Sequence, residues 1–181
     1  MIRNYLICFL LWSSINVYSQ SLYRGKGKVS FISEAPLEII KAESNELVGI
    51  IDMSNMNFAF SIDMASFQGF NSPLQKEHFK EHYLDTKKYP KAIFLGTIIL
   101  TENCDGGCDT KAICKGKFTI HGVTKIVAIP VHLTVKDGAL NISGEFLVRL
   151  SDYSIKIPRI VQAKIASEIK VTVQNVMQID K

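Results

Sequence analysis

The chain lacks a long hydrophobic run, a cluster of basic residues and the common catalytic motifs, and each absence excludes a class of protein. The apolar run YLICFLLW at residues 5–12 is shorter than the roughly 20 apolar residues of a membrane-spanning helix. The 21 Lys and Arg exceed the 17 Asp and Glu by only four. Without a basic cluster, that excess does not predict nucleic-acid binding, although it is compatible with weak, transient contact with an anionic membrane surface. No glycine-rich phosphate loop and no Gly-x-Ser-x-Gly elbow is present.

The first residues have the features of a secretory signal. Arg3 provides the positive start, the apolar run follows, and Val17-Tyr18-Ser19 offers side chains that a signal peptidase accepts. We therefore expect cleavage near Ser19 and a periplasmic or secreted location. The predicted organisation is a signal peptide at residues 1–19 and one domain at residues 20–181, a size that supports a single core.

Cysteine is scarce, with four in the whole chain. Cys8 lies within the apolar run, so removal of the signal leaves Cys104, Cys108 and Cys114. The first two flank Asp-Gly-Gly, a tip that lets their side chains meet. A local disulfide Cys104–Cys108 and free thiols both fit, since export permits disulfides. A metal site is the weaker alternative because no second cysteine pair follows.

Most of the chain reads as short strands separated by turn residues. Alternation of apolar and polar residues predicts strands, which are bounded by turns such as SNE, DGG, HG and KDGA. The predicted strands are residues 26–33, 37–44, 47–53, 55–63, 92–100, 111–120, 123–135, 140–150 and 161–173. Eight or nine antiparallel strands in one domain predict an all-β barrel or sandwich.

One region, at about residues 72–88, breaks this rhythm. Ser72 suits a helix N-cap and Pro73 the first helical turn, while Leu74 and His78 follow at helical spacing. Lysines near the end and Pro90 mark its stop. We expect a short helical excursion lying across the sheet.

Several strands are apolar on both faces. In KAIFLGTIIL at residues 91–100, both alternating sets are hydrophobic, which is unusual for an antiparallel strand with one wet face. One face would then meet covering elements or a partner chain, and the other would line an enclosed apolar space. A barrel of eight strands is wide enough either to fill itself or to hold one small ligand.

Three segments carry a resemblance to a known family. HYLDTKKYPKAIF (residues 82–94), GKFTIHGVTKIV (116–127) and GEFLVRLSDYSI (144–155) occur in this order, and together they resemble the YceI-like family of exported bacterial proteins. The resemblance implies an eight-stranded antiparallel lipocalin-like barrel that holds a long isoprenoid chain, such as a polyprenyl or quinone tail. The sequence departs from the family pattern at Ile126, where proline often follows the lysine, and in the CDGGC tip.

Two sets of histidines are candidate reactive groups. His121 stands beside a predicted turn, with no nucleophile or carboxylate placed near it in the sequence, so we interpret it as structural. His78 and His82 are four residues apart, beside Glu77 and Glu81, and form the weak alternative for a metal site or a metal-dependent enzyme. The favoured prediction includes no catalytic residue, no metal and no cofactor other than a bound lipid.

The dominant chemical content is apolar, and half of it would be ordinary core even in a ligand-binding barrel. Alternation assigns twelve residues to the wall of an apolar cavity: Met56, Phe58, Phe60, Ile62, Phe94, Ile98, Phe118, Ile120, Val127, Ile129, Phe146 and Val148. We expect a non-catalytic carrier or storage protein for a hydrophobic, polyisoprenoid or quinone-type chain. Lys88, Lys125 or Arg159 would meet a polar head group at the mouth. The remaining alternative is an interaction module whose apolar strands are covered by a partner or a second copy.

Overall fold

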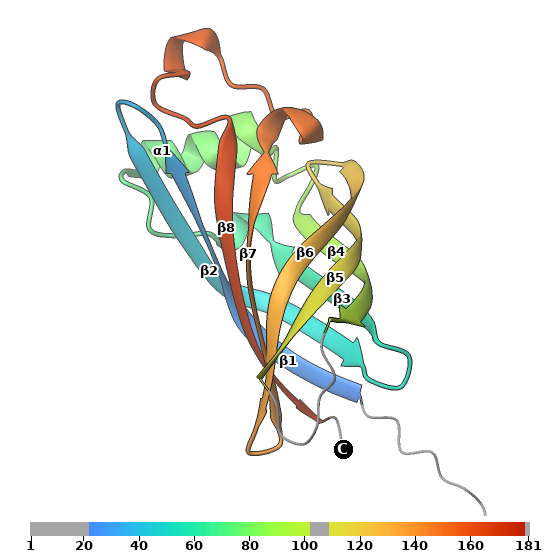
Figure 1. Cartoon of the computed structure of the whole chain (residues 1–181). Coiled ribbons are helices and arrows are strands. Elements are labelled where there is room, and N and C mark those ends of the chain that lie inside the picture. The colour runs from blue at the N-terminus through green and yellow to red at the C-terminus, as the bar shows by residue number, and fades with distance from the viewer. Residues whose placement is uncertain (1–21, 102–108, 180–181) are drawn as a thin grey trace, which may run out of the picture.

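A computed structural model of the protein describes residues 22–101 and 109–179. In that part of the chain, each strand pairs antiparallel with the next, and the last pairs with the first, so the sheet closes into a barrel (Figure 1). The eight strands are β1 (Leu22–Glu34), β2 (Ile39–Asp52), β3 (Asn57–Asp63), β4 (Lys91–Leu100), β5 (Asp109–Ile120), β6 (Val123–Lys136), β7 (Ala139–Arg149) and β8 (Glu168–Ile179). The predicted eight-stranded barrel is confirmed, and the sandwich alternative is wrong.

The connections at the two ends of the barrel differ in length. One end, the open end, carries residues 35–38, 64–90, 121–122 and 150–167 (Figure 1). These hold α1 (Pro73–His78), the π-helical turn η2 (Phe79–Tyr83) and the short 3-10 turns η1 (Met64–Ser66), η3 (Leu150–Tyr153) and η4 (Arg159–Val161). The other end, the closed end, has the tight turns at residues 53–56 and 137–138. In the described residues, no helix is long and apolar enough to cross a membrane.

The predicted helical excursion is present and starts as expected. The Ser72 hydroxyl accepts a hydrogen bond from the backbone N–H of Gln75 at 3.1 Å, and Pro73 occupies the first turn. The helical segment ends at Tyr83, earlier than Pro90, because Asp85 adopts a positive φ and the chain continues as turns.

Two strands predicted separately, residues 37–44 and 47–53, form the single strand β2. The pairing of β1 with β2 shifts between Gly27 and Val29, where Gly27 faces Leu47 and Val29 faces Ser44. Ser44-Asn45-Glu46 is therefore a β-bulge that inserts one extra residue. Its polar composition had predicted a turn, and that prediction is wrong.

Two other strand limits also differ from the prediction. Met56 lies in the β2–β3 turn at φ 59° rather than in a strand, so strand alternation does not apply to it. The predicted strand at 161–173 begins only at Glu168 and runs to Ile179. Residues 161–167 do not form a strand, and the side chains of Val161 and Ile165 line an internal cavity. The burial of these apolar residues produces an alternation in the sequence that resembles that of a strand.

The interior divides into two hydrophobic clusters. The lower cluster fills the closed end and contains Ile51, Leu140 and Met177, each at most 1% exposed. The upper cluster, which includes Leu47, Met64, Phe67 and Tyr153, lies toward the open end. On the outer face of β4, Leu95 and Ile99 are 47% and 46% exposed, so no element of the described chain covers these two side chains.

Candidate functional site: an apolar cavity at the open end

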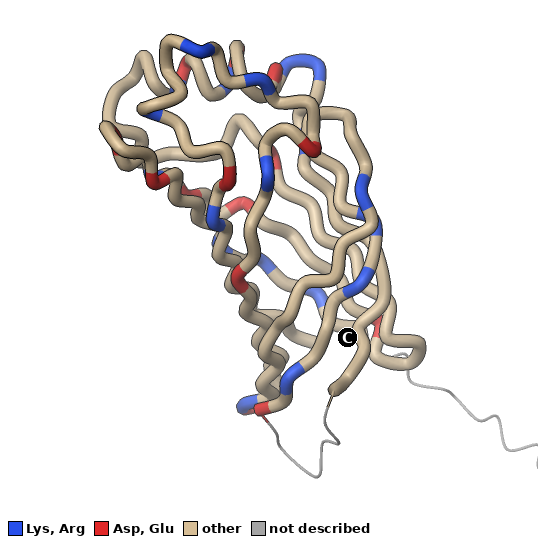
Figure 2. The backbone as a smooth tube through the Cα atoms, turned by 45° about the horizontal axis from the view of Figure 1, so that its top comes forward, with Lys and Arg blue, Asp and Glu red and all other residues tan. Residues whose placement is uncertain are grey.

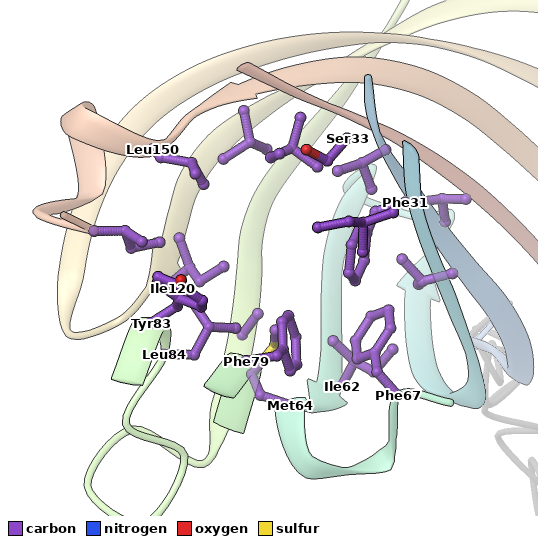
Figure 3. Close-up of a pocket in the computed structure, with 18 of the residues that line it drawn as sticks. Phe31, Ser33, Ile62, Met64, Phe67, Phe79, Tyr83, Leu84, Ile120 and Leu150 are labelled. Carbon is purple, nitrogen blue, oxygen red and sulfur yellow. The ribbon is translucent and has the colours of Figure 1, made fainter. Parts of the chain in front are cut away.

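The upper part of the barrel encloses a cavity of about 500 Å³. Its lining is almost wholly aliphatic and aromatic, with contributions from the strands and from the connections at the open end (Figure 3). Exposed Leu74 and Lys164 belong to the lining, so the cavity reaches solvent at that end. The lower cluster closes it below. Small-molecule sites in proteins have volumes of roughly 300–1,000 Å³, and this cavity falls in that range.

Eight of the twelve residues predicted for the wall do line the cavity, namely Phe60, Ile62, Phe94, Phe118, Ile120, Ile129, Phe146 and Val148. The other four lie below it. Phe58 and Ile98, each 4% exposed, belong to the lower cluster, and Met56 and Val127 pack against that cluster. Strand alternation identifies which side chains point inward, but it does not specify their depth along the barrel axis. The placement of these four on the cavity wall is therefore wrong, although Phe58 and Ile98 do face inward.

Aromatic rings form two groups on the wall. Phe31 from β1 stacks on Phe79 from η2 at 5.5 Å between ring centroids, with Phe67 and Phe70 packed against the same rings (Figure 3). On the opposite side, Phe118 contacts Phe94 at 6.0 Å, Phe146 at 5.9 Å and Tyr153 at 5.6 Å. Edge-to-face pairs of this kind hold the rings in fixed orientations, which keeps the wall in place around the empty volume.

The sequence prediction missed the contribution of the 64–90 connection. Met64, Phe67, Phe79, Tyr83 and Leu84 all line the cavity, and Figure 3 shows these side chains from the connection on the same wall as Ile62 and Phe31 of the strands. These residues lie outside strands and follow no period of two, so alternation does not select them. The available signal was the number of aromatic residues in this connection, because aromatic side chains outside strands still tend to be buried.

The three segments that carried the family resemblance meet at one place. His121 and Gly122 form the β5–β6 turn with φ of 51° and 72°, and the His121 ring lies 4.9 Å from that of Tyr89. The Nδ1 atom of His121 is 3.1 Å from the backbone oxygen of Tyr153. His121 thus joins Tyr89 of the first segment to Tyr153 of the third. This geometry agrees with a structural role for the imidazole.

His78 and His82 lie next to each other, with ring centroids 5.1 Å apart, and His78 lines the cavity. In the described part of the chain, no group of three or more His, Cys, Asp or Glu is placed to hold a metal ion. The pair supplies two nitrogen ligands, fewer than the three or four protein ligands of zinc sites.

The predicted disulfide between Cys104 and Cys108 lies outside the described residues. Cys114 is described, and its free thiol is buried at the base of the cavity wall. Burial raises the pKa of the Cys114 thiol to about 12. The thiolate is the nucleophilic form of cysteine, so Cys114 is an inert part of the wall.

The charged side chains of the lining, Glu38 and Lys164, come from connections at the open end. Lys164 lines the opening, and Arg159 lies on η4 beside it. Lys88 Nζ lies 5.1 Å from the centre of the Tyr89 ring, and hydrogen bonding to Tyr89 raises the pKa of Lys88. Lys125 is exposed on β6, close to the β5–β6 turn. Of the three residues predicted to meet a head group, Lys88 and Arg159 lie on connections that contribute to the lining at the open end, and Lys125 lies on a strand.

Comparison with known proteins gives a consistent picture. The family model of the YceI-like domain matches residues 24–177. The crystal structure of Burkholderia cenocepacia BcnA aligns with a TM-score of 0.69 at 20% identity, over 83% of this chain and 95% of that one. A polyisoprenoid binding domain from Saccharophagus degradans aligns with a TM-score of 0.72 at 12% identity, over 89% and 99%. The YceI protein of Campylobacter jejuni aligns with a TM-score of 0.57 at 18% identity, over 77% and 84%. No curated protein matches the sequence.

Proposed function

The chain belongs to the YceI-like domain family, and we propose that it binds a long hydrophobic chain, of the polyisoprenoid or quinone type, inside its barrel. The single observation that carries the proposal is the open-ended apolar cavity of about 500 Å³. The structural similarity to a polyisoprenoid binding domain supports the choice of ligand class. Binding would occur by burial, without a chemical step.

The volume sets how much ligand fits. An engineered apolar cavity of about 150 Å³ stays dry and accepts benzene, with its six carbons. On that scale, the present cavity accommodates about 20 carbon atoms, or about four isoprene units. A longer chain would extend through the mouth, where Lys164 and Arg159 lie. An anionic or hydrogen-bonding head group would therefore stay in water, next to basic side chains.

The energy is sufficient for stable binding. Each buried CH₂-sized group contributes about 0.8 kcal/mol, so one isoprene unit contributes about 4 kcal/mol. Four units give about 16 kcal/mol against an association cost of about 4–15 kcal/mol. Micromolar affinity requires about 8 kcal/mol, so binding of at least this strength follows if the association cost is no more than about 8 kcal/mol.

The N-terminal residues add a location to the proposal. Residues 1–19 would direct export, and the carrier or storage protein would act in the periplasm or outside the cell. Cell fractionation with an antibody against the barrel tests this part. A cytoplasmic, unprocessed chain would contradict it.

The test of the ligand is organic extraction of residues 20–181, purified without detergent, followed by mass spectrometry. We expect an isoprenoid species at about one molecule per chain. As a matched control, the same protein is unfolded in urea, washed, refolded and incubated with geranylgeraniol, which has four isoprene units. A protein that yields no lipid and does not take up geranylgeraniol after refolding would refute the proposed function.

A further inference from the structure

The rim of the cavity has properties that the interior does not explain. We define the rim as three segments at the open end: residues 35–38, residues 71–78 and the long β7–β8 connection at residues 150–167. Each presents a large apolar side chain to solvent: Leu37 is 72% exposed, Leu74 59% and Ile160 91%. None of the three is needed to cover the core, and each sits beside the opening rather than on the barrel wall.

Hydrogen bonds join the three segments to one another. The backbone N–H of Leu37 donates to the backbone oxygen of Ala163 at 2.9 Å, which ties the first segment to the third. The side-chain amides of Asn71 and Gln75 donate to Glu38 at 3.2 and 2.9 Å, which ties the second segment to the first. The rim is therefore one connected surface, and its exposed apolar side chains are held in fixed relative positions. Glu38 accepts both of these side-chain bonds, and the other acidic residues of the rim are Glu77 and Asp152.

The charge of the rim is positive next to the most exposed apolar residue. Residues 150–167 contain Lys156, Arg159 and Lys164 against a single acid, Asp152. Next to this connection, Arg149 is paired with Glu168 at 2.7 Å, and the pKa of its guanidinium is raised by Glu168 and, to a smaller extent, by Asp152. Within the described residues, the three basic side chains of this connection are exposed and form no ion pair. Figure 2 shows Lys and Arg along the connections at this end of the barrel.

From this arrangement we propose that the rim docks onto the surface of an anionic lipid bilayer, with Ile160, Leu37 and Leu74 inserted among the acyl chains. Apolar side chains that enter the boundary between head groups and acyl chains, combined with lysine and arginine at head-group level, are the pattern of proteins that bind membrane surfaces. Docked in this way, the mouth faces the membrane. This inference deepens the proposed function and rests on it. An isoprenoid ligand that is insoluble in water would enter the barrel from a membrane.

Leu74 supports this orientation in a second way. It belongs both to the exposed rim and to the cavity lining, so the apolar surface continues from the outside into the barrel. A lipid chain that leaves the bilayer along Leu74 would therefore keep apolar contact until it is inside. The outer barrel wall offers no such continuity: exposed Ile99 on β4 is not part of the lining.

A single-tryptophan reporter tests the proposal. The only tryptophan of the chain is Trp12, so residues 20–181 are free of it. The reporter variant is Ile160→Trp, and the matched control is Ile99→Trp, near the closed end. With vesicles containing about a third phosphatidylglycerol in phosphatidylcholine, we expect the emission of the Ile160→Trp protein to shift to shorter wavelength and to be quenched by brominated acyl chains. The control should not respond. Equal responses of the two would overturn the proposed orientation.

The charge contribution is tested by sedimentation with the same vesicles. Replacing Lys156, Arg159 and Lys164 with Gln should weaken binding by about 100-fold, since each basic residue near an anionic surface contributes about a fivefold factor. The matched control replaces Lys111, Lys115 and Lys136, on the strands near the closed end, with Gln and should bind as the unchanged protein does. Binding that is unaffected by the rim substitutions would overturn the proposal.

Uptake of geranylgeraniol without vesicles separates this inference from the proposed function. Uptake by a protein that does not bind anionic vesicles would refute the docking surface and leave the carrier function standing. Vesicle binding by a protein that takes up no geranylgeraniol would refute the carrier function, and with it the inference that docking serves loading. Vesicle binding together with uptake by the unchanged protein is the result we expect.

Discussion

Truncating a phenylalanine of the lower cluster should lower the free energy of unfolding more than truncating one on the cavity wall. The difference between the two losses measures whether the cavity is empty. Phe58 is 4% exposed and packed within the lower cluster, so Phe58→Ala removes contacts on all sides of the ring. A fully packed Phe→Ala substitution lowers the free energy of unfolding by about 3–5 kcal/mol. Phe118 lines the cavity and lacks partner atoms on that side. A ring next to a void has already lost part of its dispersion energy, so we expect Phe118→Ala to cost only about 2 kcal/mol.

Urea unfolding of lipid-free, refolded protein measures both values, followed by far-ultraviolet circular dichroism. The dependence of the unfolding free energy on urea should be the same in both variants, so that midpoints can be compared directly. Geranylgeraniol should stabilise the two variants unequally. Phe118→Ala should lose part of the stabilisation that the ligand gives, because Phe118 lines the cavity, whereas Phe58→Ala should keep it. Equal costs in the lipid-free protein would refute the reasoning, because they would mean that Phe118 is as tightly packed as Phe58 and that no empty space adjoins it.

Three further expectations follow from single sites. Gly122→Ala should lower the free energy of unfolding by about 2–3 kcal/mol, because φ is +72° and a Cβ would meet the Tyr89 ring at 2.4 Å. In the control Gly138→Ala, φ is +77° and nothing lies within 4 Å of the new Cβ, so the loss should be only the backbone strain of about 1 kcal/mol. Equal losses in the two variants would contradict the Tyr89 contact. In a Cys104→Ser/Cys108→Ser background, Cys114 should not react with a thiol reagent at pH 8 until urea unfolds the protein, since its pKa is raised to about 12; fast native-state labelling would contradict its burial. Asn175→Leu should raise the free energy of unfolding by about 1 kcal/mol, because within the described structure the buried Asn175 amide has no hydrogen-bond partner; a destabilised variant would indicate that the amide is bonded to a water molecule.

The strands and the direction of most inward side chains could be predicted from the sequence because they depend on local alternation. Within each strand, apolar residues recur with a period of two, and in a closed antiparallel sheet one of the two alternating sets faces the interior. This alternation selects Phe60, Phe94, Phe118 and Phe146. The family resemblance added the closure into a barrel, which alternation alone does not distinguish from a sandwich.

What could not be predicted depends on distance along the barrel axis and on long-range pairing. Phe58 and Phe60 are equivalent by alternation, yet one packs in the floor and the other lines the cavity. Ser44-Asn45-Glu46 has the composition of a turn, but pairing with β1 on one side makes it a bulge. Phe67 and Phe79 are brought to the cavity by the path of the 64–90 connection, and that path is fixed by tertiary packing rather than by a local pattern.

The lower cluster has a consequence for how such a protein works over time. Because Ile51, Leu140 and Met177 are packed in the lower cluster beneath the cavity, the cavity has its opening at only one end of the described barrel. Whatever enters tail first must leave head first through the same opening. Under the proposed function, a donor and an acceptor would therefore have to use this opening in turn, and the bound chain would be shielded from water in between.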